Sequence, residues 1–86
     1  MGYWEIEVAG PARPYDILLR FEAPKSGGKA VLEVGDLKVE KGLEAGVVEC
    51  MLEKVNLPPG SCRFSPWIED SEGAYGVHQA EIRVHE

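Results

Sequence analysis

The chain has 86 residues, of which 44% are hydrophobic, and its 15 acidic and 9 basic side chains give a formal net charge of −6. A chain of this length forms one small domain, with no room for a catalytic domain that has lids and a cofactor cleft. The negative charge disfavours nucleic acid and anionic membrane surfaces as partners, and no segment of the sequence could span a bilayer.

The first two expected strands are residues 3–8, which strictly alternate apolar and polar side chains, and residues 15–21, which repeat the alternation except at Leu18. This period of two is typical of strands that have one buried face. The inward positions are Trp4, Ile6, Val8, Tyr15, Ile17, Leu19 and Phe21. Leu18 lies on the outward face with Asp16 and Arg20, which indicates that this face is partly covered. A turn at residues 10–14 separates the strands, because its two prolines remove backbone donors.

The middle of the chain contains one clear hairpin and one ambiguous stretch. Residues 24–28 are a loop by composition, and residues 30–40 predict a tight hairpin that turns at Gly35 and Asp36. Residues 43–55 have helix-forming residues and an apolar side chain at every fourth position, which favours a helix. However, Gly46 interrupts them, and their second half alternates as a strand does. We expect a strand, with a helix as the alternative.

The last third of the chain, residues 57–84, is interpreted as a single hairpin. A Pro-Pro-Gly corner at residues 58–60 precedes an apolar run that ends at Trp67, and a polar loop at residues 69–73 leads to a returning strand. The total is about seven short strands with frequent turns. The predicted fold is therefore mainly β: a single small antiparallel β-sandwich or jelly-roll-like domain over residues 1–86.

The two cysteines are expected to be reduced. A simple hairpin at the Pro-Pro-Gly corner places Cys50 opposite Pro66 and Cys62 opposite Lys54, too far apart along the strands for a disulfide. If residues 43–55 form a helix, this strand register does not exist and the argument against a disulfide no longer applies.

The remaining polar side chains predict neither a catalytic residue nor a metal site. His78 has the strand parity of Ala80 and is expected at the margin of the core, and His85 is expected to be solvated. Zinc needs three or four Cys or His ligands at set spacings, which this sequence does not supply. The acidic run at residues 69–72 could hold calcium through carboxylate oxygens, but we expect a hairpin loop without an ion.

Two aromatic residues, Trp67 and Tyr75, flank this acidic loop and are the candidate ligand-binding residues. Both rings are expected to cap one end of the sandwich. The alternative is a platform on which sugar rings stack, which would make the chain a carbohydrate-binding module.

An ordered set of short motifs resembles the C-terminal region of bacterial arylsulfatase-type enzymes. The motifs are Gly2-Tyr-Trp-Glu-Ile-Glu-Val8, Tyr15-Asp-Ile-Leu-Leu-Arg20, Leu57-Pro-Pro-Gly60, Trp67-Ile-Glu-Asp70 and Gly73-Ala-Tyr75. They cover nearly the whole chain in the order of that family. One departure is at residues 21–24, Phe-Glu-Ala-Pro, where the family often has Arg-Trp-Pro after the Leu-Arg pair.

This resemblance implies a sulfuric ester hydrolase as the parent protein. Such a parent would have a Cys-x-Pro/Ala-x-Arg segment whose cysteine becomes formylglycine, and a calcium site. Neither Cys50 nor Cys62 is in such a segment, so the expected role is a non-catalytic accessory domain that packs against the catalytic domain of the same polypeptide. The sequence contains no signal peptide, and we expect the chain to be a fragment. The resemblance implies a periplasmic or secreted parent, whose signal would lie in another part of the polypeptide.

Overall fold

The computed structural model describes residues 4–8 and 11–86, except for the side chains of Ile6 and Cys62. The described residues form eight strands and no helix, and hence no helix that could cross a membrane. The strands are β1 (Trp4–Val8), β2 (Arg13–Arg20), β3 (Gly28–Val34), β4 (Leu37–Leu43), β5 (Glu49–Leu57), β6 (Gly60–Asp70), β7 (Gly73–Gly76) and β8 (Gln79–Val84). The mainly β prediction is confirmed, with one strand more than expected.

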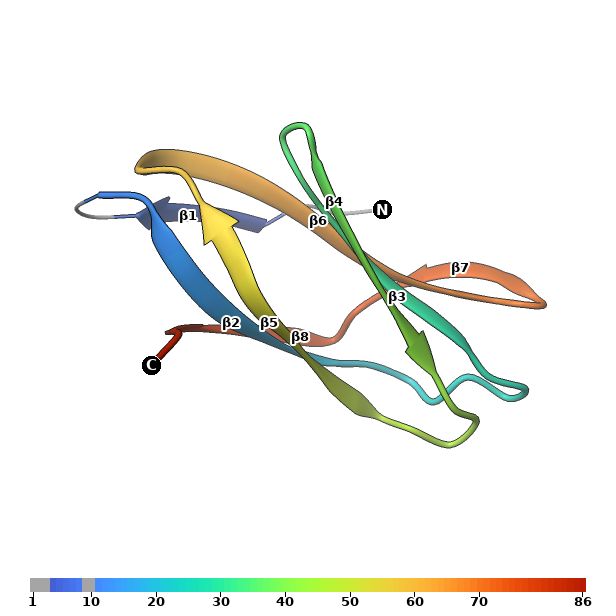
Figure 1. Ribbon diagram of the computed structural model, residues 1–86. Coiled ribbons are helices and arrows are strands. Elements are labelled where there is room, and N and C mark those ends of the chain that lie inside the picture. Colours follow the sequence, from blue (N-terminus) through green and yellow to red (C-terminus); the bar gives the residue numbers. More distant parts are fainter. Residues whose placement is uncertain (1–3, 9–10) are drawn as a thin grey trace.

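Two antiparallel sheets form the layers of a sandwich (Figure 1). The larger sheet has the order β1-β6-β3-β4, and β7 also pairs with β6. Phe64 is the register partner of both Trp4 and Val34, so β1 and β3 must lie on opposite edges of β6. The smaller sheet has the order β5-β2-β8. The molecule is 19 Å across in its thinnest direction, which fits two packed layers.

The core lies between the sheets and is built from the alternating apolar positions of the strands. Ile17, Leu19 and Phe21 from the second predicted strand are all buried, as their alternation predicts. Leu32, Phe64 and Ile68 face them from the larger sheet. Trp4 lies on the same face of the larger sheet as Phe64 and stacks on its ring, with 6.5 Å between the centroids. The prediction that Trp4 is buried is nevertheless wrong, because the residue is 37% exposed.

The predicted hairpin at residues 30–40 and the strand within residues 43–55 are both confirmed. β3 and β4 pair up to Val34 and Leu37, so the turn consists of Gly35 and Asp36, and Gly35 has a φ of 58°. The ambiguous stretch divides into the end of β4, a turn and β5.

The single hairpin predicted for residues 57–84 is confirmed only in part. β6 and β7 pair across the polar loop, as predicted. The returning strand is divided, however, because β8 pairs with β2 in the other sheet. The Pro-Pro-Gly corner, on which the cysteine register was based, does not join paired strands, since β5 belongs to the smaller sheet and β6 to the larger one. The connection at residues 77–78 is held by the backbone N–H of His78, which donates to the carbonyl of Arg20 at 2.7 Å.

Candidate functional site

The outer face of the β5-β2-β8 sheet has two apolar side chains at its centre. Ile17 and Leu19 point into the core with no exposed surface, so Leu18 between them points outward. Met51 on β5 is its register partner. Both side chains are only partly buried. We call this pair, Leu18 and Met51, the apolar centre of the face.

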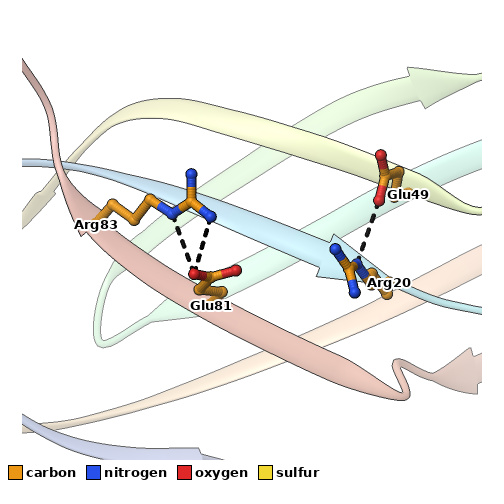
Figure 2. A network of polar contacts seen from close by, with 4 residues as sticks. All are labelled: Arg20, Glu49, Glu81 and Arg83. Carbon is orange, nitrogen blue, oxygen red and sulfur yellow. Dashed lines mark hydrogen bonds and ion pairs between the residues drawn. The ribbon is translucent and has the colours of Figure 1, made fainter.

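Two pairs of opposite charges lie on the same three strands as the apolar centre (Figure 2). Arg20 Nε lies 3.3 Å from Glu49 Oε2, and Arg83 donates through Nε and Nη2 to Glu81 Oε1 at 3.1 and 2.9 Å. These side chains are about half exposed, so each pair adds little to stability. They place polar side chains beside two apolar ones, and protein–protein interfaces likewise combine an apolar centre with a polar rim.

Asp16 fixes one end of the same face. A β-bulge lies opposite it on β5, where the register shifts between Tyr15 and Ile17, and Lys54 there has a φ of 56°. Asp16 Oδ1 accepts a hydrogen bond from the Lys54 backbone N–H at 3.2 Å and lies 2.8 Å from His85 Nδ1. Partial burial alone raises the pKa of Asp16, but the Lys54 bond and His85 outweigh it, so the pKa of this carboxyl is below its usual value of 3.8.

The two predicted ligand-binding aromatics, Trp67 and Tyr75, lie on opposite faces of the larger sheet. Tyr75 is the register partner of the buried Ile68 and packs against the core, and its hydroxyl donates to the Glu22 carbonyl at 2.9 Å. Trp67 precedes Ile68 on β6 and therefore points outward, with its Nε1 donating to Glu69 Oε1 at 2.9 Å. The two rings therefore do not share one platform.

A shallow hollow of about 330 Å³ lies beside Tyr75, where the acidic loop meets the loop between β2 and β3. Its walls include Glu22, Lys25, Asp70 and Glu72. Burial first, and then the three nearby carboxylates, raise the pKa of the Tyr75 hydroxyl. Asp70 accepts a hydrogen bond from the Glu72 backbone N–H at 2.8 Å, which closes the turn locally. Among the described residues, no group of three or more His, Cys, Asp or Glu is placed to hold a metal ion.

The structure changes the predictions for both histidines and removes the strand register on which the prediction for the cysteines was based. His78 is exposed in the connection between β7 and β8, not at the core margin, and His85 is partly buried through its contact with Asp16. Cys50 is a free, buried thiol, as predicted, but the hairpin register behind that prediction does not exist. Burial raises the pKa of Cys50, and the charge of Lys41 opposes the shift only in part. The side chain of Cys62 lies outside the described atoms.

Met51 is the member of the apolar centre that was not predicted. The sequence predicts an outward Met51 only if residues 43–55 include a strand. Its position beside Leu18 follows from the pairing of β5 with β2, which the sequence does not show. Comparisons of the chain with protein-family models, with curated proteins and with solved structures found no match. Its function must therefore be inferred from its own residues.

Proposed function

We propose that this chain is a non-catalytic accessory domain, from the C-terminal end of an arylsulfatase-type enzyme, that packs against the catalytic domain of its own polypeptide. The outer face of the β5-β2-β8 sheet is the docking surface. The observation that carries the proposal is the outward Leu18 and Met51 pair, with pairs of opposite charges on the same three strands. The sulfatase parentage rests on the ordered motifs in the sequence.

The position of the apolar centre supports docking over a role in folding. Leu18 lies on the central strand of a three-stranded sheet, with its inward neighbours already fully buried. Removing this outward side chain would leave the core between the sheets intact. The apolar surface that this leucine and methionine expose to water is removed from water only when a second surface covers it.

A pair of lysine substitutions in the parent polypeptide tests the docking surface. Leu18→Lys places a charge at the apolar centre and is expected to separate this domain from its neighbour. Val48→Lys is the matched control, since Val48 is 57% exposed and has the parity of the buried Cys50, opposite to that of Met51. Limited proteolysis should cut Leu18→Lys faster between the domains, while residues 1–86 alone should unfold as the wild type does. Equal proteolysis of the two variants would contradict the docking surface.

The parentage has its own test. The reading frame upstream of residue 1 should encode a Cys-x-Pro/Ala-x-Arg segment, and the parent should hydrolyse an aryl sulfate such as 4-nitrophenyl sulfate. Residues 1–86 alone should not hydrolyse it. Hydrolysis of the aryl sulfate by the isolated domain, or an upstream reading frame without that segment, would rule out the proposed parentage. The result of the proteolysis experiment on the docking surface would still hold.

A further inference from the structure

A second surface, on the opposite layer of the sandwich, is formed around Trp67. Val31 is the register partner of Trp67 on β3, and it points outward because its neighbours Ala30 and Leu32 belong to the core. Val31 nevertheless has no exposed surface. An outward valine on a central strand is buried only if neighbouring side chains cover it, and Trp67 is the large apolar side chain next to it. Trp67 is itself only partly buried, so part of its surface remains accessible to solvent.

A chain of polar contacts holds the indole in place. Trp67 Nε1 donates to Glu69 Oε1 at 2.9 Å, and Glu69 Oε2 lies 3.5 Å from Lys29 Nζ. Lys29 in turn donates to Glu40 Oε2 on β4 at 2.7 Å. The contacts join three neighbouring strands. A ring fixed in this way loses little conformational freedom when a ligand binds to it.

The side of the indole toward β7 is open. The register partner of Trp67 on that strand is Gly76, and the next outward residue is the exposed Ala74. A Cβ atom built on Gly76 would meet no other atom within 4 Å. The two small residues form a shelf beside the ring, defined here as Ala74 and Gly76, which a flat ligand can approach without displacing a side chain.

We propose that Trp67 and this shelf form a binding site for a neutral sugar ring. The C–H face of a sugar is apolar and can pack on the indole, while its hydroxyls can bond to Glu69 and Lys29 at the edge of the ring. A neutral sugar fits better than a sulfated or phosphorylated one, because Lys29 is held by two carboxylates and the chain carries a net charge of −6. The site lies on the other sheet from the docking surface and does not depend on it.

Native gel electrophoresis of residues 1–86 through gels containing a neutral polysaccharide tests the site. The probes are laminarin, xylan and galactan, with chondroitin sulfate as the charged comparison. Two variants remove the site in different ways. Trp67→Leu keeps an apolar cover over Val31 but removes the ring, and Gly76→Gln fills the shelf and leaves the ring in place. The matched controls are Val84→Gln, at an exposed residue of the other sheet, and Trp4→Leu at the other tryptophan.

At least one neutral polysaccharide is expected to retard the wild type, Val84→Gln and Trp4→Leu. The apparent affinity of Trp67→Leu and Gly76→Gln should be roughly tenfold weaker or more. Thermal unfolding of each variant shows whether it is folded, and one folded site variant is sufficient for the comparison. The proposal is overturned if no neutral polysaccharide retards the wild type, if a folded site variant binds as the wild type does, or if only chondroitin sulfate binds.

Discussion

Among the glycines that the structure describes, Gly28 is the one where an added Cβ would come closest to another atom. A Cβ at this position would lie 2.0 Å from the backbone carbonyl oxygen of Glu69, on the neighbouring strand β6. Because the obstacle is backbone, it cannot rotate away as a side chain could. We expect Gly28→Ala to destabilise the protein by about 1–3 kcal/mol, the usual range for overpacking.

Gly42→Ala is the matched control for this substitution. Gly42 lies on the adjacent strand β4, where a Cβ meets nothing within 4 Å. Urea denaturation of both variants measures the difference. Equal stability of the two variants would mean that β3 and β6 can separate at this point without cost.

Single residues show how far the sequence alone predicts burial. Alternation correctly placed Ile17 and Leu19 inside and Leu18 outside, because side-chain parity is a property of one strand and needs no partner. It could not show that Val31 would be buried on the outer face. That depends on Trp67, which is more than thirty positions away in the chain and adjacent only through strand pairing.

At the scale of elements, the sequence encodes where strands and turns occur but not which sheet a strand joins. The prolines at residues 58–59 mark a turn, and the same signal serves a hairpin or a crossing between layers. The division of residues 73–84 into β7 and β8 is not visible locally, because extended backbone looks the same in either sheet. Its cause is tertiary: β8 supplies the strand on the second edge of β2.

Asp16 links three elements, since it lies on β2, bonds to the bulge in β5 and contacts His85 after β8. Its pKa is lower in the folded protein than in the unfolded chain. The stabilisation that its charge provides is therefore complete above the unfolded value and is lost as the pH falls through the lower folded value. Wild type should exceed Asp16→Asn in stability at neutral pH, and the difference should disappear in the acid range below pH 3.8.

Chemical denaturation across a pH series, with Asp36→Asn as the comparison, measures this effect. Asp36 is exposed in the turn between β3 and β4. If the free energies of unfolding of wild type and Asp16→Asn differ by the same amount at all pH values, the charge of the carboxylate is not the cause. The amide would then destabilise the protein because its hydrogen bonds have a different geometry.

For the whole molecule, the sandwich follows from the number and alternation of the strands, whereas the candidate surfaces do not. Each surface combines residues from two or three strands whose neighbours are fixed only when the sheets assemble. Leu18 meets Met51 through the pairing of β2 with β5, and Trp67 gains its shelf through the pairing of β6 with β7. Sequence reasoning found one residue of each surface and missed the partners for this reason.

The two sheets bury their inner faces against each other and should unfold together. Leu19 lies in the smaller sheet and Leu32 in the larger one, and both are fully buried in one shared core. Changing either leucine to alanine should lower the free energy of unfolding by about 2–5 kcal/mol. Leu37→Ala, at a residue that is 39% exposed, should lower it much less.

Tryptophan fluorescence makes this expectation specific to one layer, because Trp4 and Trp67 both belong to the larger sheet. Leu19→Ala alters only the other sheet directly, yet its fluorescence transition should move to lower denaturant as far as its circular dichroism transition does. Such coincidence is the mark of a single cooperative unit. If the fluorescence transition of Leu19→Ala stays where it is in the wild type, each sheet is stable without the other and the shared core does not couple them.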